Sequence, residues 1–168
     1  MSETLANGKE LLEKWHRDAE IFEKAHYGSA TYSRMYNYLL GIPLVILTTF
    51  IASEVFVKMS KAVEEMNVFV NGMQTLAWIA LPLSILPPIL AGLQTFLRFP
   101  ERAVQHKEAA VKFGLLKNEI DKTLKCLPPE NELCEKINAI QSVYASVIQE
   151  SPSAGTISLM RAKKRIKK

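Results

Sequence analysis

The chain lacks the residue patterns on which most enzymes and metalloproteins depend. Its 168 residues include only two cysteines and three histidines, and they contain no phosphate-binding glycine loop, nucleophile motif or metal cluster of recognised spacing. Cys126 and Cys134 have no histidine near them, which is unlike a zinc site, so we expect reduced thiols without a function. We therefore expect no enzyme activity, no metal and no cofactor.

Charge is absent from two long stretches, residues 35–53 and 66–97. A helix needs roughly 20 apolar residues to cross ~30 Å of hydrocarbon. Runs of that length fit residues 38–57 and 75–97, and a buried helix of a water-soluble protein would rarely need them. The sequence thus predicts two membrane-spanning helices.

Basic residues are concentrated outside these stretches. Five Lys and Arg residues precede the first stretch and 14 of the 21 follow the second, whereas the connector 58–74 carries only Lys58 and Lys61. Because segments rich in Lys and Arg stay on the cytoplasmic side, this bias places both termini in the cytosol.

Apolar and small residues recur at alternating steps of three and four on either side of the predicted spans, which is typical of amphipathic helices. The first such seam is Leu12, Trp15, Ala19, Phe22, His26, Ser29, Ser33 and Tyr36, and the second is Phe99, Ala103, His106, Ala110, Phe113, Lys117, Ile120, Leu124 and Leu127. Pro128 and Pro129 should end the second helix because neither can donate a backbone hydrogen bond. A third helix then carries Leu133, Ile137, Ile140, Tyr144 and Val147 on one face and stops before Ser151.

These patterns predict an all-α membrane protein in which two transmembrane helices are extended by cytoplasmic amphipathic helices that form an antiparallel stalk. Residues 1–155 would make a single domain. The tail 156–168 has six basic residues in its last eight and no acidic residue. We expect it to be disordered and attracted to anionic lipid, with direct nucleic-acid binding as the less favoured interpretation.

Prolines are the unusual feature of the second predicted span. Pro82, Pro87 and Pro88 each remove a helical donor, so a kink or break is expected there. Ser84, Pro88, Ala91 and Thr95 share one face of the helix. These small residues could pack closely against another helix. In an oligomer they could instead line a water-filled path, with Pro87 and Pro88 as its gate.

Glu54 is the one acid near the end of the first predicted span, and Thr49 and Ser53 precede it on the same helix. Its carboxylate could simply reach the lipid headgroups. In a symmetric ring it could instead form a circle of negative charge that favours cations. Thr49, Ser53 and Glu54 are therefore added to the candidate pore lining.

Two histidines occupy similar places on the first two seams, since His26 precedes the first span and His106 follows the second at comparable distances. We expect the two rings to meet, either as an ordinary hydrogen-bonded pair or as a pH switch or shared ligand site. With Trp15, Phe22 and Phe113 they make up the candidate control seam.

The segment AEIFEKAHYGSATYSRMYNYLLGIPLVILTTFIAS joins an amphipathic helix that bears a histidine to an N-x-x-x-G-I-P pattern at Asn37, Gly41 and Pro43. A second apolar stretch, a long helix and a late Ser-Pro at Pro152 follow it. This order resembles the SLATT family, the two-transmembrane effector domains of bacterial nucleotide-signalling and conflict systems, over about residues 5–155.

The resemblance implies a pore-forming or membrane-disrupting effector of antiviral defence in the bacterial inner membrane, kept inactive until a partner signals. Partners in the family include nucleotidyltransferases, nucleotide sensors and reverse transcriptases. We expect a homo-oligomer in the lipid bilayer that causes cell death by opening the membrane. A non-conducting membrane scaffold that tethers a cytosolic partner is the alternative.

Overall fold

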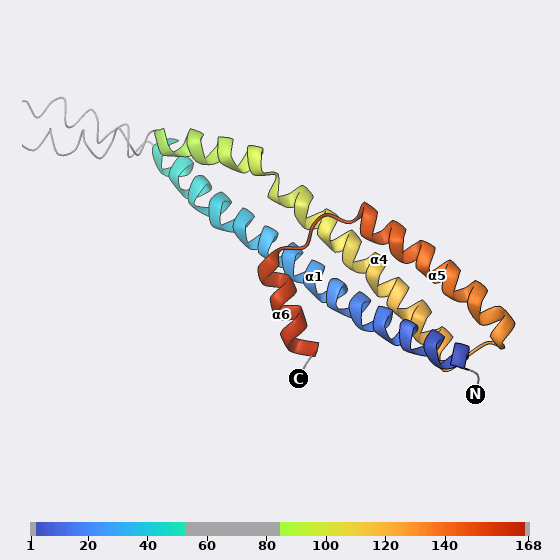
Figure 1. Cartoon of the computed structure of the whole chain (residues 1–168). Coiled ribbons are helices and arrows are strands. Elements are labelled where there is room, and N and C mark those ends of the chain that lie inside the picture. The colour runs from blue at the N-terminus through green and yellow to red at the C-terminus, as the bar shows by residue number, and fades with distance from the viewer. Residues whose placement is uncertain (1–2, 53–84, 167–168) are drawn as a thin grey trace, which may run out of the picture. The chain divides into compact units, whose positions relative to one another are not determined.

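The computed structural model of the protein describes residues 3–52 and 85–166 (Figure 1). In these ranges α1 spans Glu3–Ala52, α4 spans Phe99–Lys125, α5 spans Glu130–Glu150 and α6 spans Thr156–Ile166. Residues 85–97 are helical as well, and no strand occurs in the described ranges. The all-α part of the prediction is confirmed.

The prediction of a membrane protein with two spans is contradicted. Among the residues that the structure describes, no helix is long and apolar enough to cross a membrane. Of the predicted spans, residues 38–52 lie in α1 and residues 85–97 lie in a second described helix. Residues 53–57 and 75–84 lie outside the described ranges. The inner-membrane location and the transmembrane pair are therefore not supported.

The chain divides into two compact units, one formed by residues 1–33 with residues 100–168 and the other by residues 34–99. In the first unit α1, α4 and α5 lie side by side, and α6 lies against α1 (Figure 1). The pairs Phe22–Phe113 and His26–His106 show that α1 and α4 run antiparallel, as the two seams predicted. The core of this unit is a bundle of three helices.

The core of the bundle follows the spacing of the seams. Its buried members come from all three long helices: Leu12, Ala19, Phe113, Leu116, Ile120, Leu133, Ile140 and Val147. Trp15, Phe22, Leu124, Ile137 and Tyr144 pack against them. The face predicted for the third helix is confirmed, and that helix stops at Glu150 as expected. Helix α4 ends at Lys125, ahead of Pro128.

The second unit pairs the end of α1 with residues 85–97. Gln94 Nε2 donates a hydrogen bond to Asn37 Oδ1 over 3.0 Å. Gly41 leaves room for the same side chain, since a Cβ at this position would lie 3.3 Å from Gln94 Nε2. At the end of the unit Arg98 has a positive φ of 47°, which ends one helix just before α4 begins at Phe99.

Residues 156–166 differ from the prediction, because they form α6 instead of a disordered tail. Ser158 and Ala162, one helical turn apart, are buried. Gly28 permits this approach, since a Cβ on it would lie 3.3 Å from the Cβ of Ser158. The Gly155 N–H donates to Ser29 Oγ over 3.2 Å just before the helix starts. Small residues on α1 and on α6 therefore let the two helices pack closely. This packing stabilises α6, which is too short and too basic to be a stable helix by itself.

Candidate functional site

The candidate control seam is brought together in the bundle. Phe22 stacks on Phe113 with ring centroids 5.2 Å apart, and Phe113 stacks on His26 at 5.5 Å. Trp15 lies nearer the N-terminus of α1 and stacks on Tyr144 of α5, with ring centroids 6.0 Å apart. The sequence did not indicate this contact. Phe113 and His26 are buried, and Trp15 and Phe22 are partly buried against the core, so these residues of the predicted seam stabilise the bundle through aromatic packing.

His26 and His106 meet as predicted, with their Nδ1 atoms 3.1 Å apart. One nitrogen donates and the other accepts, so the two rings must be in different tautomers when both are neutral. Burial, and then the charge of His106, lowers the pKa of His26 to about 4. Burial, and then the charge of Arg102, also lowers the pKa of His106. The pair is therefore neutral at pH 7 and cannot form if both rings are charged.

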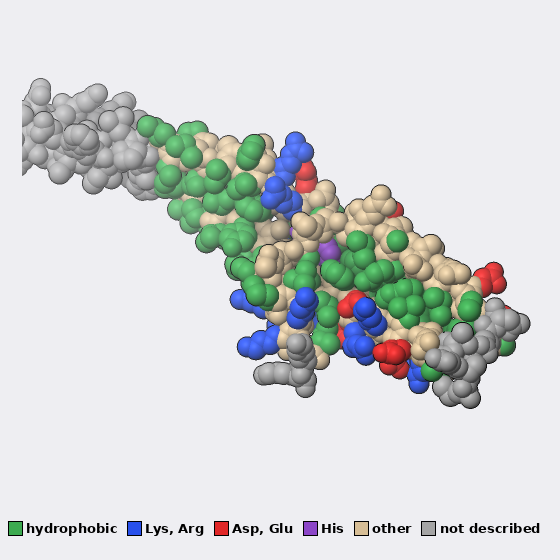
Figure 2. All heavy atoms as spheres, in the orientation of Figure 1, with side chains coloured by type: hydrophobic (Ala, Val, Ile, Leu, Met, Phe, Trp, Pro, Cys, Tyr) green, Lys and Arg blue, Asp and Glu red, His purple; other side chains and the backbone are tan. Residues whose placement is uncertain are grey.

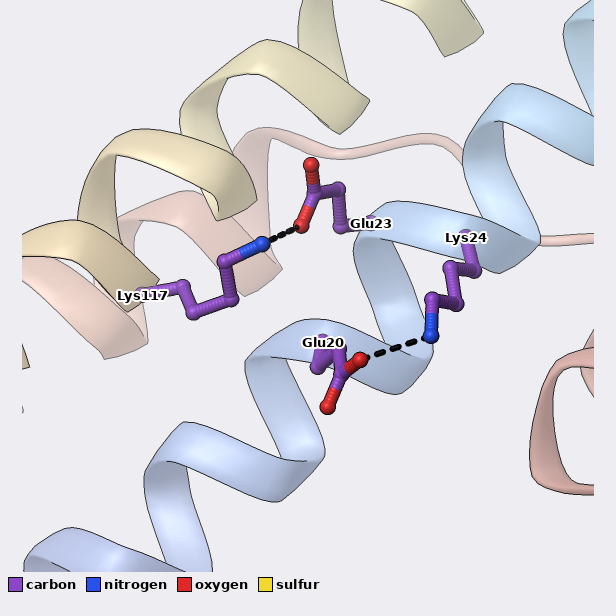
Figure 3. A network of polar contacts seen from close by, with 4 residues as sticks. All are labelled: Glu20, Glu23, Lys24 and Lys117. Carbon is purple, nitrogen blue, oxygen red and sulfur yellow. Dashed lines mark hydrogen bonds and ion pairs between the residues drawn. The ribbon is translucent and has the colours of Figure 1, made fainter. Parts of the chain in front are cut away.

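A partly buried ion pair joins α1 to α4 close to the aromatic rings. Lys117 Nζ donates to Glu23 Oε2, and neighbouring Lys24 pairs with Glu20 within α1 at 2.6 Å (Figure 3). Gly114 makes room for the bridge, since a Cβ there would lie 3.2 Å from Glu23 Oε1. The sequence placed Lys117 on the seam but gave no sign of its partner on α1.

A groove of about 790 Å³ runs between α4 and α5. Its apolar lining consists of Leu115, Leu116, Ala139, Ile140, Val143 and Val147, and its charged lining includes Lys112, Glu119, Asp121, Lys122 and Lys136. Leu115 is 64% exposed and Val143 is 49% exposed. Hydrophobic side chains reach the surface along both helices in Figure 2. An apolar face of this kind on a helical bundle is suited to packing against further helices.

A smaller cleft of about 330 Å³ lies between α1 and α6. Its lining is rich in cations and hydroxyl groups: Lys24, Tyr27, Gly28, Thr31, Tyr32, Ser158, Arg161, Ala162 and Arg165. The guanidinium carbon of Arg161 lies 5.3 Å from the centre of the Tyr32 ring. The sequence missed this site because it depends on the docking of a tail that was expected to be disordered.

The residues predicted to line or gate a pore are not assembled as one lining. Pro87 is buried, whereas Pro88 and Thr95 are exposed and Ala91 is partly buried. Thr95 Oγ1 donates to Ala91 O and Thr49 Oγ1 donates to Val45 O, so both hydroxyls are satisfied by their own helices. The helix is continuous from residue 85 to residue 97, without a break at the prolines. Ser53, Glu54, Pro82 and Ser84 lie outside the described residues.

Metal-binding chemistry is not evident in the part of the chain that the structure describes. Within it, no group of three or more His, Cys, Asp or Glu residues could hold a metal ion. Cys126 and Cys134 are free and exposed. The histidine pair supplies two nitrogens that already bond to each other, so it is better described as a packed pair than as a metal centre.

The described part of the chain is therefore an all-helical protein built on an antiparallel bundle, with an apolar groove on one face and a basic cleft beneath α6. No protein-family model, curated protein or solved structure matches this chain. The resemblance to the SLATT family stays a prediction, and the proposals below depend on the geometry of the bundle.

Proposed function

We propose that the chain is a non-catalytic helical effector whose copies associate through the α4–α5 groove and which a partner protein holds inactive. The observation that carries this proposal is the groove itself, because it leaves Leu115 and Val143 about half exposed or more on a folded bundle. Large apolar side chains in a continuous surface strip are characteristic of interaction sites.

Self-association fits the shape and charge of this surface. Helices pack when the side-chain ridges of one fill the grooves of another, so two copies of the α4–α5 pair can form a layer of four helices. Twofold symmetry would use the same face on both copies. Charges of both signs line the groove, among them Lys136 and Glu119, so two identical faces need not repel each other.

The antiviral setting is supported by the SLATT resemblance over about residues 5–155. The resemblance supports an effector whose activity is controlled by a partner protein, which would be a nucleotidyltransferase, a nucleotide sensor or a reverse transcriptase. The pore and the membrane scaffold both required the two spans and are not part of the proposal.

A pair of matched substitutions tests the groove. Val143 in the groove and Val104 on α4 outside it are 49% and 54% exposed, so Val143→Glu and Val104→Glu place the same charge at similarly exposed sites. We expect wild type and Val104→Glu to self-associate in sedimentation equilibrium, and Val143→Glu to weaken association at least tenfold because its carboxylate would be buried in the contact.

Two results would contradict the proposal. A wild-type chain that stays monomeric up to high micromolar concentration leaves the groove without a second copy, and equal effects of the two variants would place the contact elsewhere.

A phage challenge of cells that express the chain with its partner then tests the antiviral role, since plaque protection should be lost with Val143→Glu and kept with Val104→Glu.

A further inference from the structure

The cleft between α1 and α6 is lined by three cations and by no acid. Lys24, Arg161 and Arg165 line it, and no Asp or Glu residue is among its lining residues. Lys24 pairs with Glu20, one turn earlier on α1, at 2.6 Å, which uses one of its three ammonium hydrogens. Figure 2 shows Lys and Arg side chains gathered around α6. This arrangement favours a ligand that brings its own negative charge.

Aromatic rings lie beside these cations. Tyr32 carries the Arg161 guanidinium over its face, and Tyr27 is 43% exposed within the cleft lining. The lining also contains the buried Ser158 and Thr31, whose Oγ1 donates to Tyr27 O over 2.9 Å and keeps its lone pairs free to accept. A planar guanidinium can bind two oxygens of a phosphate at once, and a tyrosine ring can stack on a heterocyclic base. Both kinds of side chain line the same cleft.

We propose that this cleft binds a nucleoside phosphate. Its volume of about 330 Å³ lies at the lower end of the range of roughly 300–1,000 Å³ that is usual for small-molecule sites, so it suits one nucleotide unit and not a strand. Arg161 and Arg165 would bind the phosphate, and Tyr27 would stack on the base. The cleft lies apart from the α4–α5 groove, so the test of one site does not depend on the other.

The test uses the purified full-length chain and isothermal titration with ATP, adenosine and inorganic phosphate. Four substitutions on α6 remove one positive charge each: Arg161→Gln and Arg165→Gln in the cleft, and Lys163→Gln and Lys164→Gln outside its lining. We expect ATP to bind more tightly than adenosine or phosphate alone. The two arginine substitutions should weaken ATP binding at least tenfold, and the two lysine substitutions less than twofold.

Arg165→Gln decides the outcome, because Arg161→Gln also removes the contact with Tyr32 and could detach α6. Hydrogen exchange of residues 156–166 checks that α6 stays docked in each variant. No heat with ATP at millimolar concentration would overturn the proposal. Equal losses in all four variants would also overturn it, as would tighter binding of a 20-nucleotide single strand that depends equally on Lys163 and Lys164. Equal losses in all four variants, or tighter binding of the single strand, would indicate that binding depends on the overall positive charge of α6 and not on the cleft.

Discussion

At the scale of single residues, His26 shows the cost of placing a titratable ring in a packed core. It is 2% exposed, lies against Phe113 and has His106 as its hydrogen-bond partner. A charged ring there would lose its water shell and gain no acid in exchange, since desolvation is the main cause of its lowered pKa. The folded bundle therefore prefers the neutral ring.

The histidine pair predicts a bundle that weakens in mild acid. With a pKa of about 4 in the folded state and 6.5 in the unfolded state, His26 takes up its proton more readily when unfolded. Its contribution is fully present above pH 6.5 and is lost as the pH falls towards 4, by about 2 kcal/mol at pH 5. His106 acts in the same direction. Urea unfolding at pH 7.5 and pH 5 measures this loss.

His16, the third histidine, provides the matched control. His26→Gln should remove most of the difference between the two pH values, whereas His16→Gln should keep it. The window stops at pH 5 because Glu20 and Asp121, whose pKa values are lowered by Lys24 and Lys125, lose their charge in more acidic solution. An unfolding free energy that does not change between pH 7.5 and pH 5 in the wild type would contradict the prediction.

At the scale of elements, α6 depends on its contact with α1. Its 11 residues are too few for a stable isolated helix in water, and its basic residues repel one another. Gly28→Leu should therefore undock α6, because even a Cβ at this position would lie 3.3 Å from Ser158. We expect amide protection in residues 156–166 to fall at least tenfold in hydrogen exchange.

Gly92→Leu is the control for this change, since nothing lies within 4 Å of a Cβ placed on Gly92. Both variants replace a helical glycine by a good helix former, so an effect on backbone propensity would be common to them. If α6 kept its protection in Gly28→Leu, the close contact with Ser158 would not be what holds the helix.

The sequence predicted the elements that carry strong periodicity and missed those that depend on contacts between distant segments. Steps of three and four located the cores of α4 and α5, and Pro128 located the end of α4. The docking of α6 was missed because the small residues Gly28 and Ser158 carry no periodic signal. The turn at Arg98 was missed as well, since a positive φ is rare in arginine and is fixed by its surroundings.

The charge-free runs did not lead to a confirmed span, since no helix in the described ranges is long and apolar enough to cross a membrane. A charge-free run signals burial, but it does not by itself distinguish lipid from protein. In the second unit, the described helices expose large apolar side chains, among them Leu39 at 64% and Phe96 at 82%, and are joined by the hydrogen bond from Gln94 to Asn37. Within the candidate site, the contact between His26 and His106 and the aromatic seam could be predicted from the sequence. The groove and the cleft could not, because they depend on how the surfaces of packed helices meet, which residue spacing does not reveal.

At the scale of the whole molecule, residues 156–168 are rich in basic side chains, whereas α6 contributes little to the core. Residues 156–168 hold six Lys and Arg residues and no acid, so their removal changes the formal net charge from +4 to −2. The hydrophobic core cluster contains residues of α1, α4 and α5 only, within the described ranges. The bundle should therefore fold without α6, although the formal net charge of the chain would change from positive to negative.

A chain that ends at Gly155 brings the two proposed sites into one comparison. Because the lost contacts are few and small, we expect a cost of about 1 kcal/mol and a fall in Tm of roughly 2–4 °C. Self-association should persist, since every residue that lines the groove lies on α4 or α5, and ATP binding should vanish with the loss of Arg161 and Arg165. Thermal unfolding by circular dichroism, sedimentation equilibrium and titration calorimetry measure the three properties on the same sample. A truncated chain that no longer unfolds cooperatively would make α6 part of the core, and one that still binds ATP would move the nucleotide site away from the cleft.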